Sequence, residues 1–289
     1  MNFEIVTDSS ANLPDELIEK YDIHILSLLY HIGDTEYVSY VKGKKTDLTE
    51  FYTRMRNKEV ITTSCMSSGS CRTVFEKILK EGKDLLYIGF SSALSATYQT
   101  GCQALEELKK DYPNRKILSV DTLGASLGEG LIVSYAAKFR EEGNSIDFVY
   151  DWLMENRLHL CHWFTVDDLF YLMRGGRVST SSAIVGTVLS IKPVMHMDDG
   201  GHLVPVSKVR GRKNSLRALL EKMEETAICP ENQIIYISHG DCLDDANYLA
   251  DKIREKFGIK DILIRLVEPV IGAHCGPGTV ALFFIGTER

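Results

Sequence analysis

The sequence predicts an α/β protein of two domains, and three observations lead to this fold class. The chain has 289 residues, a length that suits roughly two domains. Short apolar runs alternate with helical patterns through the first half, which indicates parallel strands joined by crossover helices. In the second half, a DDGG turn at residues 198–201 separates two extended runs and predicts a hairpin. We therefore expect a Rossmann-like parallel-sheet domain over residues 1–157 and a mixed-sheet α/β domain over residues 158–289.

The elements of the first half are read from apolar runs and from helix start and stop signals. Strands are expected over residues 3–7, 23–32, 35–41, 60–61, 85–88 and 116–120. Pro14 marks the start of a short helix, Asp47 begins a capping-box pattern, and Ser145 caps a helix that bridges the two domains. Gly82 and Gly143 mark the ends of two further helices.

The second half is predicted to contain a sheet with antiparallel pairs. Strands are expected over residues 158–166, 193–197, 202–206, 234–238, 262–266 and 280–285. A short helix ends at Arg174-Gly175-Gly176-Arg177, and two longer helices cover about residues 214–226 and 244–257. Residues 180–190 are apolar and small, which indicates a third, packed helix.

Composition and charge exclude several classes of protein. The chain is 44% apolar and 25% charged, the balance of a globular protein with a sizeable core. Its net charge of −7 argues against a general nucleic-acid binder. The first residues, MNFEIVTDSS, lack the basic and apolar regions of a signal peptide, so we expect a cytoplasmic protein. Seven scattered cysteines without a CxxC pair suit reduced thiols.

Polar segments follow four of the expected strands. They are DSS at residues 8–10, TTS at 62–64, SS at 91–92 and DT at 121–122. Ligands of parallel sheets bind at the carboxyl ends of the strands, so we expect these segments to converge. The richest is GFSSALSATYQTG at residues 89–101, where a helix start would favour a phosphate or a carboxylate. The alternative is that one of its serines is simply an N-cap.

Three fingerprints of enzymes and cofactor proteins are missing from the sequence. It contains neither the Gly-x-Gly-x-x-Gly nor the P-loop pattern of nucleotide sites, and no His-Glu-x-x-His zinc motif. We therefore expect no cofactor and no metal. A Ser–His hydrolase or acyl transferase, using a serine of residues 91–95 with His274, stays open although the Gly-x-Ser-x-Gly elbow is absent.

A basic segment stands out in this acidic chain. Five of the ten residues at 208–217 are Lys or Arg, among them Lys208 and Arg210. The segment is either a solvated helix start or, together with Arg174 and Arg177, a docking face for an acidic or anionic partner. A protein that acts only as an interaction module through this face is therefore a third hypothesis.

These features together resemble the DegV family of fatty-acid-binding proteins. The resemblance spans essentially the whole chain. It rests on the ordered set VTDSS (6–10), TTS (62–64), SSALSATYQ (91–99), RGGRVS (174–179), IKPV (191–194), VSKVRGR (206–212) and GAHCGPG (272–278). The resemblance implies a bacterial acyl carrier with the lipid held between two α/β domains. Such a carrier is no enzyme: it presents the carboxylate of a long-chain fatty acid to a separate fatty acid kinase subunit for phospholipid metabolism.

The resemblance also implies which residues bind. The carboxylate is expected on hydroxyls and one imidazole, namely Thr62, Thr63, Ser64, Ser92, Ser95 and His274. Which of the two threonines contacts the ligand stays open. The kinase is expected to dock on Arg174, Arg177, Lys208 and Arg210. Contact with a membrane surface is expected to be transient at most, and residues 183–189 are candidates for lining the acyl tail.

Two segments of this chain depart from the family pattern. Cys65-Met66 stands where the family has Gln-Pro after the Thr-Thr-Ser segment. YVKGKK at residues 40–45 replaces Asp-Gly-Val-Asp. The first change bears on the shape of the carboxylate site, and the second on the rim of the pocket or on a surface contact.

Overall fold

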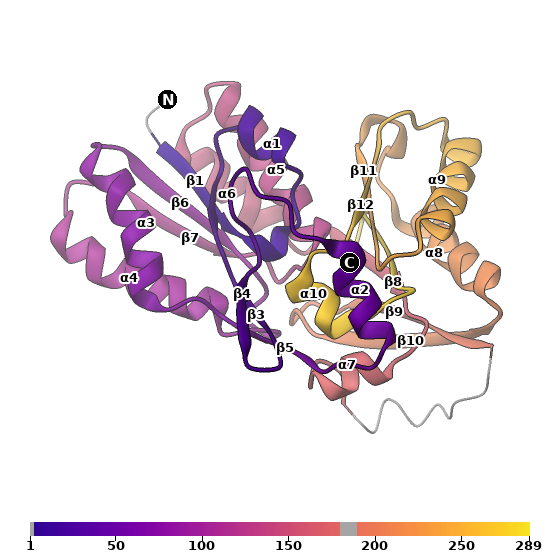
Figure 1. Ribbon diagram of the computed structural model, residues 1–289. Helices are drawn as coiled ribbons and strands as arrows, with labels where there is room; N and C mark the ends of the chain where they lie inside the picture. Colours follow the sequence, from indigo (N-terminus) through magenta and orange to yellow (C-terminus); the bar gives the residue numbers. More distant parts are fainter. Residues whose placement is uncertain (1–2, 180–189) are drawn as a thin grey trace.

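The computed structural model describes residues 3–179 and 190–289, which form two large sheets and one small sheet with their helices (Figure 1). The predicted α/β class is confirmed. The helix expected over residues 180–190, and with it the tail-lining candidates at 183–189, lies outside the described residues, apart from Ser190, which is in a turn. None of the helices in the described part of the chain is both long and apolar enough to span a bilayer.

The first large sheet is parallel throughout, as predicted. Its strand order is β2-β1-β6-β7. The strands are β1 (Phe3–Asp8), β2 (His24–Leu26), β6 (Asp84–Gly89) and β7 (Ile117–Asp121). One face is covered by α3 (Ser68–Lys80) and α4 (Thr97–Asp111), and the other by α5 (Leu127–Glu141) and α6 (Ile146–Asn156). The short helix α1 (Asp15–Lys20) connects β1 to β2.

The second large sheet is mixed, also as predicted. Its order is β10-β9-β8-β13-β11-β12. Among the described strands of this second sheet, β11 and β12 pair in parallel and all other neighbours pair antiparallel. The strands are β8 (Leu160–Thr165), β9 (Ile191–Met197), β10 (Leu203–Arg210), β11 (Ile235–His239), β12 (Ile262–Leu266) and β13 (Val280–Ile285). One face is covered by α8 (Arg212–Thr226) and α9 (Leu243–Phe257).

Helix α5 joins the two large sheets into one core. It packs against β1 on one side and against β8, β11 and β13 on the other. Ten of its residues are buried, including the run from Leu127 to Val133. A helix that is buried on most of its faces belongs in a protein interior, and α5 forms the layer between the two large sheets. We keep as a proposal the domain boundary between residues 157 and 158, which falls between α6 and β8.

A third, antiparallel sheet corrects two predictions. It consists of β4-β3-β5, that is β3 (Leu29–Ile32), β4 (Thr35–Val38) and β5 (Ile61–Ser64), with α2 (Leu48–Arg56) beside it. The prediction of a single strand over residues 23–32 is wrong: the segment is divided into β2 and β3. At residues 27 and 28, hydrogen bonds that involve serine hydroxyls take the place of hydrogen bonds to a neighbouring strand. The Ser27 hydroxyl donates to a carbonyl, and the Leu28 N–H donates to the Ser9 hydroxyl.

The second correction concerns residues 62–64. They were expected in a loop at the carboxyl edge of the parallel sheet, but they form most of β5 in the small sheet. Their β-branched threonines suit a strand, and β3 supplies the partner that a reading of local sequence does not show.

The remaining described helices are short. They are the 3₁₀ segments η1 (Ser9–Ala11) and η2 (Pro230–Asn232) and the α-helices α7 (Phe170–Arg174) and α10 (Pro269–Cys275). Helix α10 was not predicted, although Pro269 at its first position is a start signal. Glu268 caps it by accepting the N–H groups of Val270 and Ile271.

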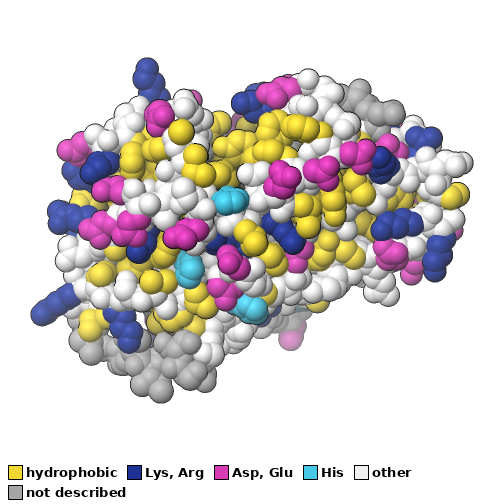
Figure 2. All heavy atoms as spheres, turned by 180° about the vertical axis from the view of Figure 1, so that it is seen from behind, with side chains coloured by type: hydrophobic (Ala, Val, Ile, Leu, Met, Phe, Trp, Pro, Cys, Tyr) yellow, Lys and Arg dark blue, Asp and Glu magenta, His cyan; other side chains and the backbone are white. Residues whose placement is uncertain are grey.

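The molecular surface is mixed in charge. On the face turned away from the viewer in Figure 1, acidic and basic side chains are interspersed with hydrophobic ones (Figure 2). This pattern agrees with the modest net charge of −7.

Candidate functional site

A cavity of about 360 Å³ lies where the three sheets meet. Its volume falls in the range of sites for small ligands. Most of its wall is apolar, and the aliphatic and aromatic side chains that line it include Leu28, Phe90, Leu94, Phe164, Leu172, Met197, Leu203, Val267, Val270, Ile271 and Phe283. Such a wall suits a long apolar ligand better than a sugar or a nucleotide.

Four of the six predicted carboxylate ligands line this cavity together. They are Thr63, Ser64, Ser95 and His274. The hydroxyl of Thr63 lies 2.8 Å from Nε2 of His274, although the two residues are 211 positions apart in the chain. The hydroxyl of Ser64 lies 3.0 Å from Nε2 of His31, which fixes the end of β5 against β3.

The other two predicted ligands are placed differently. Thr62 is exposed and does not belong to the described lining of the cavity. Ser92 is also absent from the described lining. Its N–H donates to Asp121 and its carbonyl accepts from Gln99, so its backbone shapes the loop. The sequence left open which of the two threonines faces the ligand site. In the structure, Thr63 lines the cavity and Thr62 does not belong to its described lining.

His274 is a neutral imidazole in this site. Burial first, and then the charges of Arg177 and Arg174, lower its pKa to about 4. Its Nδ1 atom is buried without a hydrogen-bond partner among the described residues. Gly175 packs against that atom, since a Cβ there would lie 2.2 Å from Nδ1.

The Thr63–His274 pair retains a donor for a ligand. A hydroxyl and a neutral imidazole carry two protons, and their mutual contact uses only one of them. When His274 donates from Nε2, the hydroxyl proton of Thr63 is free to reach an acceptor in the cavity.

Arg177, which was expected on the docking face, lies in the cavity wall, and its part in docking stays a proposal. Its Nε donates to the carbonyl of Leu94 at 3.0 Å, and a second nitrogen donates to the carbonyl of Gly175. The side chain is half-buried, and burial lowers the pKa of its guanidinium. A fixed cation thus stands beside the hydroxyls, a counter-charge that the sequence reasoning did not place there.

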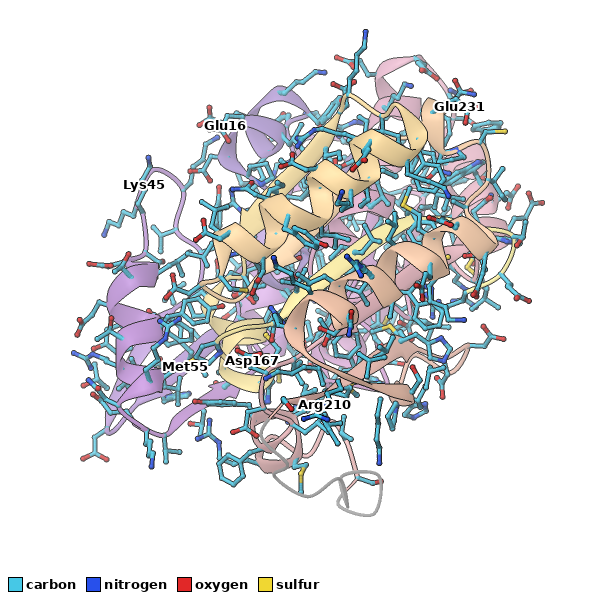
Figure 3. The ribbon with its side chains drawn as sticks, turned by 90° about the vertical axis from the view of Figure 1, so that its right-hand side faces the viewer. Glu16, Lys45, Met55, Asp167, Arg210 and Glu231 are labelled. Atoms are coloured by element: carbon cyan, nitrogen blue, oxygen red, sulfur yellow. The ribbon has the colours of Figure 1, made fainter. Side chains whose placement is uncertain are left out.

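The three other expected docking residues have different surroundings. Arg174 is half-buried, with its guanidinium 5.9 Å from the ring centre of Phe170 and 5.3 Å from that of Tyr171. Lys208 and Arg210 are exposed on β10, two positions apart and therefore on the same face. Arg210 lies at the same end of the molecule as Asp167 (Figure 3).

Part of the basic segment is neutralised within the protein. Arg212 forms ion pairs with Asp245 at 2.8 Å and with Asp167 at 3.7 Å, and Lys192 pairs with Asp167 at 2.8 Å. These contacts leave Lys208 and Arg210 as the outward-facing cations of this strand.

The segment at residues 89–101 contributes both to the start of α4 and to the cavity wall, although the N-cap residue of α4 is Ala96 and forms no side-chain capping bond. The Ser95 hydroxyl accepts the N–H of Thr97 at the start of α4, and Ser95 also lines the cavity. Gly89 and Gly101 are required for packing, because a Cβ at either position would lie within 3 Å of the buried Tyr87 ring.

Two further features bear on the chemistry. Cys65, at the departure from the family pattern, contributes to the cavity wall. Among the described residues, neither a serine nor a carboxylate hydrogen-bonds to His274, so the geometry contains no Ser–His–Asp arrangement.

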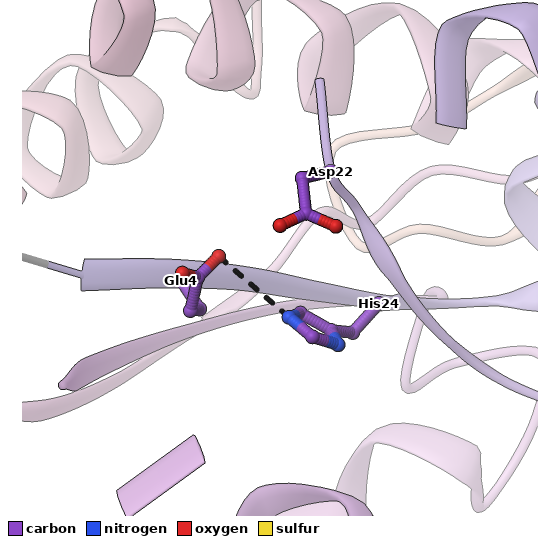
Figure 4. A group of neighbouring side chains, drawn as sticks. All are labelled: Glu4, Asp22 and His24. Atoms are coloured by element: carbon purple, nitrogen blue, oxygen red, sulfur yellow. Dashed lines mark ion pairs between the residues drawn. The ribbon is translucent and has the colours of Figure 1, made fainter. Parts of the chain in front are cut away.

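One group of side chains has the spacing of a metal site. Possible ligand atoms of Glu4, Asp22 and His24 lie within 4.8 Å of one another (Figure 4). Glu4, however, already pairs with Lys83 at 2.6 Å and with Arg140 at 3.0 Å. Burial raises its pKa, but hydrogen bonds to His24 and Lys83 and the charge of Arg140 lower it further, to about 2. Two fixed cations would repel a metal ion here, so the group is best described as an ion-pair cluster.

Comparison with known proteins identifies the class and then the family. Three solved lipid- or fatty-acid-binding proteins share this fold over nearly their whole length. A DegV lipid-binding protein of Thermotoga maritima has a TM-score of 0.86 and 31% identity, with 100% of both chains covered. A fatty-acid-binding DegV family protein of Thermus thermophilus has a TM-score of 0.87 and 27% identity, covering 99% of this chain and 100% of the other. DegV of Bacillus subtilis, a fatty-acid-binding protein, has a TM-score of 0.84 and 26% identity, covering 99% of this chain and 100% of the other.

The family itself follows from the sequence matches. Residues 2–287 match the family model described as "Uncharacterised protein, DegV family". A DegV domain-containing protein of Clostridium perfringens is 45% identical over 287 residues, which cover 99% of this chain and 98% of that protein. This chain belongs to the DegV family.

Proposed function

We propose that this protein binds a long-chain fatty acid in the cavity between its sheets and presents the carboxylate to a separate fatty acid kinase subunit. The observation that carries the proposal is the composition of one cavity wall. This wall is apolar over most of its area, and its polar side chains include Thr63, His274 and Arg177. The solved relatives from Thermus thermophilus and Bacillus subtilis are fatty-acid-binding proteins, which supports the same ligand class for this chain.

Both parts of such a ligand are accommodated by the wall. Each buried methylene contributes about 0.8 kcal/mol, so a tail of roughly fifteen methylenes gains on the order of 12 kcal/mol. A carboxylate without donors would lose much of that gain. The free proton of the Thr63–His274 pair and the guanidinium of Arg177 supply hydrogen-bond donors and a positive charge.

The kinase subunit enters the proposal because phosphorylation needs a nucleotide site. The sequence has no nucleotide fingerprint, so a partner must bring ATP to the carboxylate. We assign the docking surface to Lys208 and Arg210, the exposed cations of β10, together with Arg174 of α7. In this role the protein is a carrier, and it performs no acyl chemistry itself.

Lipid extraction tests the ligand. Mass spectrometry of an organic extract of the purified protein should show a long-chain fatty acid, and the delipidated protein should take up palmitic or oleic acid with saturation. A protein that carries no lipid and takes none up would refute the proposal. Turnover of acyl esters that disappears in Ser95→Ala would instead favour a hydrolase in the same cavity.

A further inference from the structure

A second polar group lies in the cavity wall, apart from the residues assigned to the carboxylate. It consists of Ser126 before α5, Ser238 in β11 and His162 in β8. These side chains are deeply buried, with exposed fractions of 5%, 0% and 3%. None of the three shares a hydrogen bond with Thr63, Ser95, Arg177 or His274 among the described contacts.

Ser126 occupies a helix start without serving as its cap. No side-chain capping bond is formed there, and its hydroxyl lies 3.0 Å from the hydroxyl of Ser238. Its backbone has φ 55° and ψ −147°, a conformation that L-residues rarely adopt. Such backbone costs on the order of 1–3 kcal/mol and persists where the surroundings impose it. The strained backbone directs this hydroxyl across to β11 and into the cavity wall.

The serine pair has one donor to spare. Two hydroxyls carry two protons, and the contact between them uses one. Neither hydroxyl makes another bond within the described part of the chain. A plain alkyl chain passing this point would leave the second proton unsatisfied, which is unfavourable in a buried site.

His162, the third member of this group, is neutral and fully hydrogen-bonded. His162 accepts the N–H of Ala125 at Nε2 and contacts the carbonyl of Leu160 at Nδ1, so both ring nitrogens are used. Burial, and then the charge of Arg289, lower the pKa of His162 to about 3, which keeps the ring neutral. Arg289 donates to four backbone carbonyls, those of Thr122, Arg157, Leu160 and Asp198.

We infer that Ser126 and Ser238 form a subsite for one uncharged oxygen carried on the acyl chain, so that the ligands include hydroxy- or oxo-substituted fatty acids. The inference rests on the proposed binding of fatty acids in this cavity. A hydroxyl or keto oxygen accepts the spare proton of the serine pair. The preference depends on the position of the oxygen, because only one carbon of a bound chain can lie beside the serine pair.

Competition binding tests the subsite. Delipidated protein is loaded with a fluorescent fatty acid, which is displaced by octadecanoic acid and by isomers with a hydroxyl at successive carbons. One isomer should bind at least as tightly as octadecanoic acid. Ser238→Ala should weaken that isomer about five- to tenfold, the effect of one hydrogen bond, and leave octadecanoic acid as tight or tighter. Ser126→Gly should act alike, since glycine tolerates this backbone.

The control is Ser215→Ala, which removes a buried serine hydroxyl of α8 that does not line the cavity and should leave every affinity unchanged. The inference is overturned when octadecanoic acid binds but every hydroxylated isomer binds more weakly. It is also overturned when Ser238→Ala leaves the ratio of the affinities unchanged. Failure to bind any of these acids refutes the proposed function as well. If a variant does not fold, the affinities of the wild-type protein for octadecanoic acid and its hydroxylated isomers decide whether the subsite exists.

Discussion

At the scale of single residues, the two threonines of β5 provide a matched test of the carboxylate site. Thr63→Val keeps the shape of the side chain but removes the hydroxyl that contacts His274. We expect fatty-acid affinity to fall about tenfold, since a hydrogen bond to a charged group contributes about 1.5 kcal/mol or more. Thr62→Val changes an exposed hydroxyl and should have no effect. Equal losses in the two variants, measured by calorimetry, would contradict the assignment.

Arg177 supplies the charge of the site, and its role depends on the charge of the ligand. Arg177→Met should weaken binding of a fatty acid by an order of magnitude or more, while binding of the corresponding fatty alcohol changes little. Because Arg177 helps to lower the pKa of His274, the same variant should raise that pKa toward its ordinary value. Titration of the histidine by NMR measures the shift. An unchanged pKa, or an equal loss for acid and alcohol, would remove Arg177 from the site.

At the scale of secondary-structure elements, α4 shows where a helix tolerates no side chain. A Cβ at Gly101 would lie 2.5 Å from Cε1 of Tyr87, whose ring is fully buried and has no room to move. We expect Gly101→Ala to lower the free energy of unfolding by about 1–3 kcal/mol. Gly69→Ala in α3 is the control, because the nearest atom to a Cβ at that position, Oγ of Ser67, lies 3.8 Å away. That change should be neutral or stabilising in urea denaturation; destabilisation by Gly69→Ala alone would contradict this account.

Helix α10 depends on a buried acid. Burial raises the pKa of Glu268 to about 7, although hydrogen bonds from Ser39, Ile271 and Val270 oppose the shift. A carboxyl whose pKa is higher in the folded state contributes stability below its unfolded pKa, and that contribution is lost as pH rises to about 7. The loss is on the order of 3 kcal/mol. Glu268→Gln should therefore show a smaller fall in the free energy of unfolding between pH 5 and pH 8 than the wild type does. Identical pH profiles would contradict the assignment.

The elements also show which parts of this structure are encoded locally. The caps at Asp47 and Ser145 and the parallel and mixed sheets were predicted, because short-range signals determine them. Most of strand β5, beyond the extended residues predicted at 60–61, and helix α10 were not, because β5 pairs with a distant strand and α10 is packed against β3, β5 and α2. The candidate site depends on these two elements, since β5 carries Thr63 and α10 carries His274. The family resemblance therefore indicated Thr63 and His274, but only the tertiary structure brings them together and places Arg177 in the same cavity wall.

At the scale of the whole molecule, the site is a product of the contact between the two halves of the chain. The first half contributes Thr63, Ser95 and the loop after β6, and the second contributes His274 and Arg177. Helix α5 fills the space between the two large sheets next to this cavity. A ligand bound there touches both halves, so it should stabilise the folded state in proportion to its affinity.

Variants of the docking surface should distinguish binding of the fatty acid from its presentation to the kinase. We expect Lys208→Glu combined with Arg210→Glu to reduce phosphorylation of the bound acid by at least tenfold. Reversing two exposed charges replaces attraction to an acidic partner by repulsion. Fatty-acid affinity should remain unchanged, since neither residue belongs to the described lining of the cavity. The assay is acyl phosphate formation with ATP and the fatty acid kinase subunit of the same organism. Lys260→Glu, an exposed lysine between α9 and β12, is the control and should keep full phosphorylation. Equal losses in both proteins would indicate a general charge effect in place of a defined docking face.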